Sequence, residues 1–369
     1  MGAGANKAMP GMRSCRRAVI AFVVAATIPT LLIGAFVYAM DPFQHYRPST
    51  AYFYNMRYLS PGLAKHLDYD ILVVGDSLTQ NFRESVIQRT LGAPALNLSM
   101  QGSSLFEQAT LIRHAATTGK LRTVLWGIHP WAASGGIERV STKDFPRFLY
   151  DNNPFNDWEY IYNRNILELS FSKLLHPPPP AAPELDRFNV WYNDKEMRPG
   201  RDRVLKKYHR PKRVNRRLSP DYAPGGLIAS FNHNILSTVQ GHPEVEFVIF
   251  VPPYSMLDYA TELFAEPLRM NAKMRFLAHA FEQLSDEPNV RLFFFSGVTS
   301  LTGNLDNYRD VRHYWMHIND WMLESIAGNR FRLTPDNWQA VFSSFLQMVR
   351  DADIDTLMAP VPKDASPLG

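Results

Sequence analysis

The stretch Asp70-Ile-Leu-Val-Val-Gly-Asp-Ser-Leu-Thr79 decides the fold. Its apolar run, residues 71–74, is short and uninterrupted, as is typical of a parallel strand buried on both faces. The three residues that follow the run favour a tight turn. Apolar residues then recur at helical spacing from about Phe82 to Leu91. A buried strand that leads through a turn into a helix is the repeating unit of an α/β domain.

The same pattern recurs along the chain. Four further apolar runs predict strands at residues 95–98, 123–127, 246–251 and 290–295. Helical patterns occupy residues 104–118, 227–240 and 256–284, and a last helix is expected over 335–349 with Thr334 as its cap. We therefore expect an α/β domain over residues 68–350, a three-layer sandwich with a mostly parallel sheet. Residues 134–225 interrupt the pattern and are interpreted as an insertion.

Composition excludes several classes of protein. The chain has 369 residues, of which 46% are hydrophobic, so it can form a sizeable core and is not globally disordered. Its 39 Lys and Arg against 35 Asp and Glu give a net charge of +4, which does not favour nucleic acid as a partner. The single cysteine, Cys15, excludes an intramolecular disulfide and a Cys-rich zinc site. No cluster of Cys, His and carboxylates has the spacing of metal ligands, so we expect no metal or other cofactor.

The N-terminal region predicts a membrane anchor. Residues 18–40 carry no charge, and a helix of this length crosses a hydrocarbon core of about 30 Å. Lys7, Arg13, Arg16 and Arg17 precede the apolar run, and positive charges favour the cytoplasmic side. We therefore expect residues 1–17 in the cytoplasm, a single pass through the inner membrane, a tether over residues 41–67 and the main domain on the periplasmic side.

A cleavable signal peptide is the alternative interpretation of this region. Val37-Tyr38-Ala39 resembles a weak cleavage site, but signal peptides have apolar runs of about 7–15 residues, shorter than this one. Residues 351–369 are Pro-rich and predict a loose tail. Ten Lys or Arg lie between Arg198 and Arg217, which is typical of a solvated surface, with acidic polysaccharide or anionic lipid as the alternative contacts.

Candidate reactive side chains follow the predicted strands. Ser77 comes directly after the first strand, and ligands of parallel sheets bind at the carboxyl ends of strands. A serine hydroxyl is a poor nucleophile unless a histidine accepts its proton and a third group orients that histidine. Asp310 and His313 are three residues apart, so both side chains can point to one side of a turn. We therefore predict Ser77, His313 and Asp310 as nucleophile, base and orienting acid; the alternative for Ser77 is a simple helix cap.

This set of residues resembles the SGNH (GDSL-type) hydrolase superfamily. The resemblance rests on Val73-Val-Gly-Asp-Ser-Leu-Thr79 near the start of the domain and on Asp310-x-x-His313 near its end. It implies the same three catalytic roles and an oxyanion hole formed by the N–H groups of Ser77 and Gly102. Where the family has a Gly-x-Asn-Asp-like block, this chain reads Trp126-Gly-Ile-His-Pro-Trp131, so His129 is the candidate third donor in place of the asparagine.

The chain is also similar to the membrane-tethered branch of that superfamily, whose members act in D-alanyl transfer to teichoic acid or in alginate acetylation. The resemblance implies a serine esterase or O-acyltransferase that acts on acyl groups, above all acetyl, of an envelope or exported polysaccharide. A membrane-bound acyl-transfer or export protein is the implied partner. A non-catalytic carbohydrate-binding or scaffold subunit of a polysaccharide export complex is the alternative, and the absent asparagine favours it.

Overall fold

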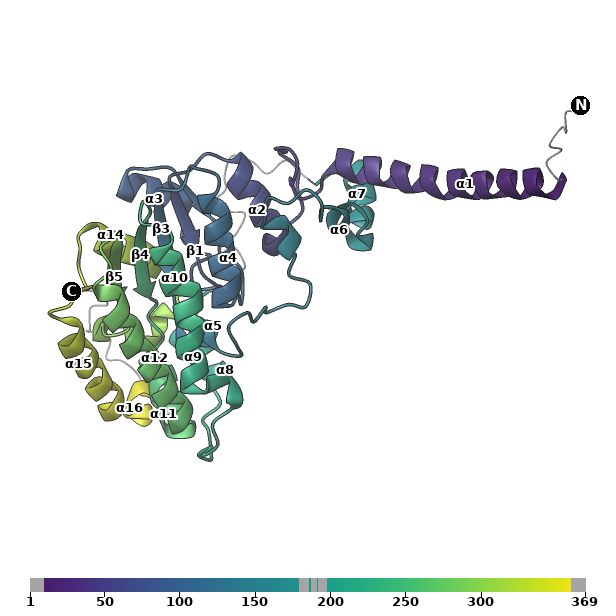
Figure 1. The fold of residues 1–369 in the computed structure, drawn as a ribbon. Helices are drawn as coiled ribbons and strands as arrows, with labels where there is room; N and C mark the ends of the chain where they lie inside the picture. Colours follow the sequence, from purple (N-terminus) through teal and green to yellow (C-terminus); the bar gives the residue numbers. More distant parts are fainter. Residues whose placement is uncertain (1–9, 179–185, 187–190, 192–197, 360–369) are drawn as a thin grey trace, which may run out of the picture. The chain divides into compact units, whose positions relative to one another are not determined.

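A computed structural model describes residues 10–178, 186, 191 and 198–359 (Figure 1). Contacts divide the chain into two compact units. One contains residues 1–54 and 147–180, and the other contains residues 55–146 and 181–369. The larger unit carries the sheet and the candidate catalytic residues. Part of the segment interpreted as an insertion, residues 147–180, groups with the N-terminal unit.

The larger unit is an α/β domain built on a mixed, mostly parallel sheet. The strands are β1 (Ile71–Val74), β2 (Ala95–Asn97), β3 (Thr123–Gly127), β4 (Glu246–Val251), β5 (Val290–Phe294) and β6 (Arg332–Leu333). They lie in the order β2-β1-β3-β4-β5-β6, and only β6 is antiparallel to its neighbour. Residues 71–74 are all buried, which explains why this strand carries no alternation of polar and apolar residues. The five strands predicted from the sequence are confirmed to within a residue or so, and the short β6 was not predicted.

Helices cover both faces of this sheet (Figure 1). One face packs against α3 (Glu84–Leu91) and α14 (Met316–Ala327). The other carries α12 (Pro267–Ser285) and α15 (Trp338–Asp351), whose Phe281 and Phe342 pack against Phe294 of β5. The remaining helices of the unit are α2 (Met56–His66), α4 (Leu105–Ala116), α5 (Pro130–Ala133), α8 (Arg201–Lys207), α9 (Pro224–Phe231), α10 (Ser237–Gln240), α11 (Met256–Ala265), α13 (Thr299–Thr302) and α16 (Ile354–Met358).

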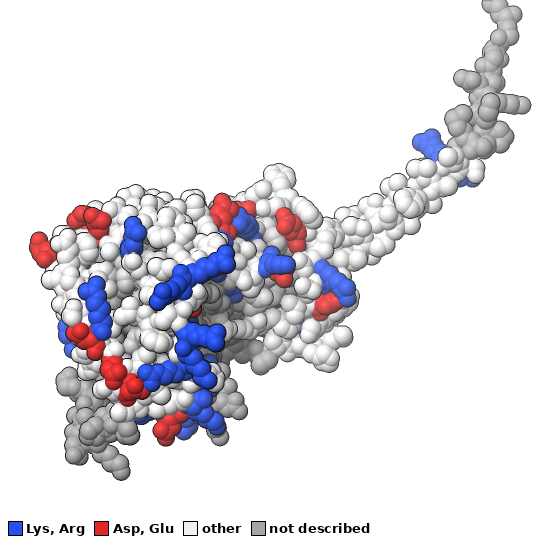
Figure 2. Space-filling model, turned by 90° about the horizontal axis from the view of Figure 1, so that it is seen from below, with Lys and Arg blue, Asp and Glu red and all other residues white. Residues whose placement is uncertain are grey.

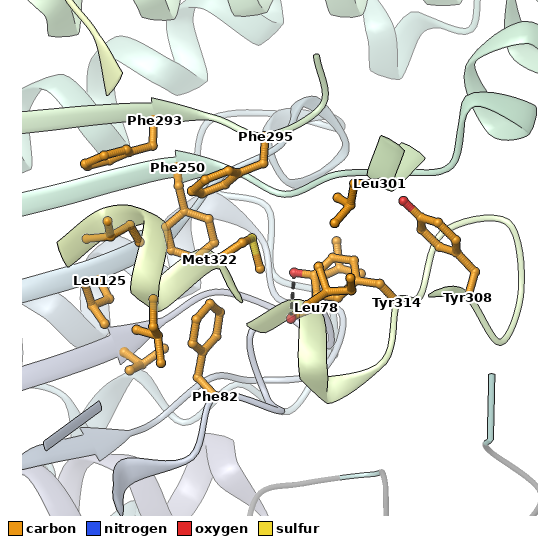
Figure 3. Packing of buried hydrophobic residues seen from close by; sticks show 14 of the residues in the cluster. Leu78, Phe82, Leu125, Phe250, Phe293, Phe295, Leu301, Tyr308, Tyr314 and Met322 are labelled. Carbon is orange, nitrogen blue, oxygen red and sulfur yellow. Dashed lines mark hydrogen bonds between the residues drawn. The ribbon is translucent and has the colours of Figure 1, made fainter. Parts of the chain in front are cut away.

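A buried apolar cluster supports the turn that carries Ser77. Figure 3 shows Leu78 and Phe82, which follow β1, packed among side chains of β3, β4, β5 and α14. The Tyr314 hydroxyl donates a 2.9 Å hydrogen bond to the Leu78 carbonyl, drawn as a dashed line in Figure 3. Leu78 follows Ser77 and Tyr314 follows His313, so this bond joins the two segments that carry the candidate nucleophile and base.

Several helix boundaries differ from those predicted. The last long helix begins at Trp338 rather than at Pro335, and Thr334 is not its cap: the Asn337 side chain instead accepts a hydrogen bond from the Thr334 N–H. The helix predicted over 256–284 is two helices, because Pro267 starts a new helix after Ala265. The tail expected to be loose contains α16, capped by the Asp353 side chain. The predicted tether also contains a helix, α2.

The basic segment 198–217 is partly folded onto the domain. Val204 of α8 is buried in the apolar cluster, and the Arg201 guanidinium donates to the Leu357 carbonyl at 3.1 Å. Arg210 forms an ion pair with Asp355. On the face drawn in Figure 2, Lys and Arg side chains lie among Asp and Glu side chains. Part of this positive charge is therefore neutralised within the domain.

The smaller unit contains α1 (Pro10–Met40), α6 (Trp158–Ile161) and α7 (Arg164–Leu175). Residues 14–40 of α1 form a helix long and apolar enough to cross a membrane. Cys15 lies on this helix and is exposed. Asp41 follows the helix, and its carboxylate accepts hydrogen bonds from the N–H groups of His45, Tyr46 and Arg47 at 2.8–3.0 Å. These bonds fold the chain back on itself where α1 ends.

One partly buried acid, which follows the turn that carries Ser77, makes the stability of the fold depend on pH. Burial raises the pKa of Glu84, at the start of α3, to about 7, although its carboxylate accepts a hydrogen bond from the Asn97 N–H. A raised pKa in the folded state means that stability is full below the unfolded value near 4.5 and falls as pH rises towards 7. We expect Glu84→Gln to stabilise the protein by roughly 1–2 kcal/mol at pH 8 and by almost nothing at pH 4.5, measured by thermal unfolding. Glu282→Gln, an exposed position on α12, is the control and should change neither value; equal stabilisation at both pH values would contradict the prediction.

Candidate functional site

Ser77 lies in a turn at the carboxyl end of β1. Gly75 has φ +157°, and a Cβ there would lie 2.5 Å from the Thr79 Oγ1 atom, so only glycine fits. Asp76 Oδ1 accepts a 3.0 Å hydrogen bond from the Leu78 N–H, which fixes the turn as the sequence predicted. The Trp191 indole N–H donates to the Ser77 carbonyl at 2.8 Å. Hydrogen bonds before and after Ser77 therefore fix its backbone, and Ser77 lines a cavity.

The structure brings the three predicted side chains together. Ser77 Oγ lies 2.9 Å from His313 Nε2, although the two residues are 236 positions apart in the sequence. The other ring nitrogen, His313 Nδ1, lies 2.9 Å from Asp310 Oδ2 and 3.0 Å from Oδ1. This is the hydrogen-bonded order that a serine nucleophile needs: hydroxyl, imidazole and carboxylate.

Asp310 is held as a carboxylate. Burial alone would raise its pKa, but the hydrogen bond and charge of His313, with backbone N–H groups, hold the pKa well below its ordinary value. Those N–H groups are the ones of Arg312 and His313, each 2.9 Å from Oδ1. A carboxylate can only accept hydrogen bonds, so His313 Nδ1 carries a proton and Nε2 is left free to accept one from Ser77.

Two candidate backbone donors belong to residues that line the cavity. Ser77 and Gly102 line the same cavity, and neither of their N–H groups is bonded to another described residue. Gly102 has φ +61°, in the left-handed region that glycine adopts without strain. A Cβ at this position would approach nothing closer than 3.9 Å, so the need for glycine comes from the backbone and not from crowding. The arrangement suits an oxyanion hole, in which unpaired N–H groups bind a developing negative charge.

His129 also reaches the cavity, but as part of a second buried acid–imidazole pair. Its Nε2 atom lies 2.6 Å from Asp76 Oδ2, and its Nδ1 atom is buried with no hydrogen-bond partner. The ring stacks on Trp131 with ring centroids 6.0 Å apart. Burial opposes ionisation of Asp76, but the His129 charge and hydrogen bond hold the Asp76 pKa below its ordinary value. The sequence predicted His129 as a candidate donor and missed its bond to Asp76.

Three cationic side chains line the cavity, and the sequence did not predict them there. The cavity has a volume of about 300 Å³, and Arg269, Lys273 and Arg312 contribute to its wall. These cations form ion pairs with two buried acids that do not line the cavity. Glu262 lies 2.6 Å from Arg269 and 2.7 Å from Lys273. Asp258 lies 3.1 Å from Arg312. The partner acids lie outside the lining, so three cationic groups face the cavity, whereas the lining acid Asp76 is paired with His129. We call Arg269, Lys273 and Arg312 the basic wall. Only the recurrence of Arg269 and Lys273 on one helix face, four residues apart, signals this in the sequence.

No metal site accompanies these residues in the part of the chain that the structure describes: no group of three or more His, Cys, Asp or Glu side chains there could hold an ion. Neither a scan against protein-family models nor a search of curated proteins gives a match for this chain. The site is therefore defined by its own geometry: a serine hydroxyl, an imidazole and a carboxylate in hydrogen-bonded order, in a cavity that Gly102 and the basic wall also line.

Proposed function

We propose that this protein is a serine esterase or O-acyltransferase of the SGNH type, acting on acyl groups, above all acetyl, of an envelope or exported polysaccharide. The 2.9 Å contact between Ser77 Oγ and His313 Nε2, with Asp310 behind the imidazole, is the observation that carries the proposal. The apolar helix α1, which is long enough to cross a membrane, supports an anchored enzyme. The positive residues that precede the helix are the reason to propose that the main domain lies on the periplasmic side.

The reaction follows from the site. His313 Nε2 takes the hydroxyl proton as Ser77 Oγ attacks the carbonyl carbon of an ester, and the carbonyl oxygen becomes an oxyanion between the N–H groups of Ser77 and Gly102. When the intermediate collapses, the bond to the leaving alcohol breaks and His313 returns the proton to that alcohol. The acyl group is now an ester of Ser77. A water molecule or a sugar hydroxyl then attacks the acyl carbon while His313 takes its proton. The bond to Ser77 Oγ breaks, His313 returns the proton to Oγ, and an acid or an acylated sugar is released.

His129 is proposed as the third donor to the oxyanion. Its Nε2 is engaged by Asp76, so the unpartnered Nδ1 is the ring atom left for a ligand. An asparagine amide occupies this place in the superfamily that the chain resembles. Because the Asp76 carboxylate can only accept, Nε2 carries a ring proton, and Nδ1 donates to an oxyanion only when the ring is a doubly protonated imidazolium, the form that a neighbouring carboxylate stabilises. In that form the ring supplies an N–H donor in place of the asparagine amide, so the missing asparagine does not by itself favour a non-catalytic protein.

A covalent serine probe tests the proposal. We expect a fluorophosphonate to react with the full-length protein in detergent and to add its mass to the peptide that contains Ser77. Ser77→Ala should remove the label. If the natural protein stays unlabelled while acetylated polysaccharide still binds to it, the protein is instead a carbohydrate-binding subunit, and the esterase proposal fails.

The basic wall of the cavity favours substrates with a negative group near the ester, such as a carboxylate or a phosphate. Arg269→Gln removes one of these cations; Glu262 stays paired with Lys273, and Glu266, the other acid bonded to Arg269, is partly exposed to solvent, so the fold should tolerate the change. We expect the KM for an acetyl ester that carries a carboxylate to rise about tenfold, equivalent to about 1.4 kcal/mol of lost binding. The kcat and the KM for a neutral acetyl ester should stay within about twofold.

Arg275→Gln is the matched control for this comparison, because Arg275 lies on the same helix, is exposed and does not line the cavity. Its KM for both esters should equal that of the natural protein. Equal rises in KM for the charged and the neutral ester in Arg269→Gln would mean that Arg269 shapes the cavity rather than recognises charge.

A further inference from the structure

The smaller unit carries a cluster of exposed apolar side chains that the proposed reaction does not use. They lie on α6, on α7 and in the segments that flank α6, and their exposed fractions run from 46% to 89%. Single exposed apolar residues are ordinary on a soluble surface, but a cluster of this density marks an interaction site. We call this cluster the apolar platform: Phe155, Trp158, Tyr162, Phe171, Leu174 and Leu175.

The apolar platform is attached to α1 near the end of its apolar stretch. The rings of Phe36 and Phe171 lie 4.7 Å apart. Gly34 is buried, and a Cβ there would lie only 2.9 Å from the Tyr162 hydroxyl oxygen. Phe36 is four residues before Met40, so the contact lies about 6 Å from the end of the helix. If α1 crosses a bilayer, this is the depth at which it leaves the hydrocarbon core.

Polar contacts fix the platform to the same place. The Tyr160 hydroxyl of α6 donates to the Asp41 carboxylate at 3.0 Å, and the Lys173 ammonium of α7 donates to the Asp41 carbonyl at 3.2 Å. His45 Nε2 lies 3.1 Å from Asp157 Oδ1 at the start of α6. The two short helices therefore cannot swing away from α1 without breaking buried hydrogen bonds.

The distribution of side chains on α7 favours lipid as the occupant. An exposed ion pair, Arg164 with Glu168, occupies its first half, and Phe171, Leu174 and Leu175 occupy its last turns. Trp158 and Tyr162 are of the two residue types most enriched at the level of lipid headgroups. Figure 2 shows no charged side chain along most of the length of α1, so the platform continues an apolar surface that already suits a membrane.

We propose that the apolar platform inserts into the headgroup region of the bilayer that α1 crosses, and so forms a second membrane contact. A single helix would leave this unit free to rotate about the helix axis. A second contact by the apolar platform, where the helix leaves the membrane, holds this unit in one orientation at the membrane surface. The platform also explains why residues 147–180 return to the N-terminal unit although they are distant from it in sequence.

Depth measurement by spin labelling tests this proposal on the full-length protein. The natural cysteine is replaced by Cys15→Ser, and Leu175→Cys or Phe171→Cys supplies a single attachment site for a spin label. The protein is reconstituted into vesicles of phosphatidylethanolamine and phosphatidylglycerol. Val341→Cys is the matched control, since Val341 is an exposed apolar residue of the other unit.

Collisions with oxygen, which concentrates in lipid, are compared with collisions with a water-soluble nickel chelate. We expect the oxygen-to-nickel ratio at positions 171 and 175 to exceed that at position 341 by about fivefold or more, as for a residue at the membrane interface. A ratio equal to that of the control would overturn the proposal, because the platform would then face water. Protection from both reagents would also overturn it, because a protein surface would then cover the platform. Neither result depends on whether Ser77 is catalytic.

Discussion

Ser77→Ala is expected to lower the turnover of 4-nitrophenyl acetate by about a thousandfold or more, to the rate given by binding and backbone donors alone. The change removes the oxygen atom that would form the proposed acyl-enzyme and leaves His313 without the Ser77 hydroxyl to deprotonate. Among the described residues, the hydroxyl makes one side-chain hydrogen bond, the 2.9 Å contact with His313 Nε2, and the neighbouring backbone bonds to Tyr314 and Trp191 do not involve it. The fold should therefore survive, with a change in stability of about 1 kcal/mol or less.

The control for this experiment is another serine whose hydroxyl is bonded outside the cavity. Ser344 on α15 donates to the Ala340 carbonyl of its own helix, and Ser344→Ala should keep full turnover. Steady-state kinetics and thermal unfolding of both variants separate chemistry from stability. Normal turnover in Ser77→Ala would remove the nucleophile from the proposed reaction, and the hydroxyl would then be a helix cap.

The meeting of Ser77, Asp310 and His313 could be predicted because it depends on few assumptions. Parallel strands place their carboxyl ends at one edge of a sheet, and Ser77 directly follows such a strand. The spacing of Asp310 and His313 fixes their pairing on one turn, whatever the details of the fold. Uninterrupted apolar runs predicted the five main strands for the same reason: each is buried on both faces and so leaves little choice of residue.

The rest of the site depends on tertiary packing, which local sequence patterns do not predict. Lys273 and Arg269 lie on a helix that reads as an ordinary amphipathic segment, and only the packing of α12 brings them to the cavity. The bond between His129 and Asp76 joins the ends of two strands across the sheet, so neither residue's neighbours in the sequence indicate it. Strand β6 has only two residues and pairs through its position beside β5, so no apolar run could predict it.

The contacts of the smaller unit also could not be predicted from local sequence patterns. Residues 147–180 differ in composition from the strand–helix pattern and were predicted as an insertion, but their contacts lie with α1 and with the residues that follow it. The Phe36–Phe171 contact joins positions far apart in the chain, and its residue types are equally common in any apolar core. Only the count of exposed apolar side chains in the folded structure separates this surface from core material.

Asp310→Asn is expected to lower kcat by about a thousandfold to ten-thousandfold with little change in KM, because it changes which ring nitrogen of His313 carries the proton. Oδ1 of Asp310 accepts the N–H groups of Arg312 and His313 at 2.9 Å, so the oxygen of the new carboxamide should take that place. Its NH2 group then stands where Oδ2 was, 2.9 Å from His313 Nδ1. A donor at that point favours the ring tautomer with the proton on Nε2, which cannot accept a proton from Ser77.

The pH dependence of unfolding measures whether Asp310 is ionised in the folded state, and kcat measures separately what this carboxylate does for His313. Because the pKa of Asp310 is held below its ordinary value, its ionisation stabilises the folded state above the unfolded value of about 3.9, and this contribution is lost as the pH falls through the folded value. The natural protein should therefore unfold at a higher temperature than Asp310→Asn at pH 7, and the difference should shrink below about pH 4. Asp306→Asn, a nearby acid that accepts only the Arg201 N–H among the described side-chain contacts, is the control and should keep its kcat. An Asp310→Asn variant with normal kcat and the same pH dependence of unfolding as the natural protein would show that His313 does not need this carboxylate.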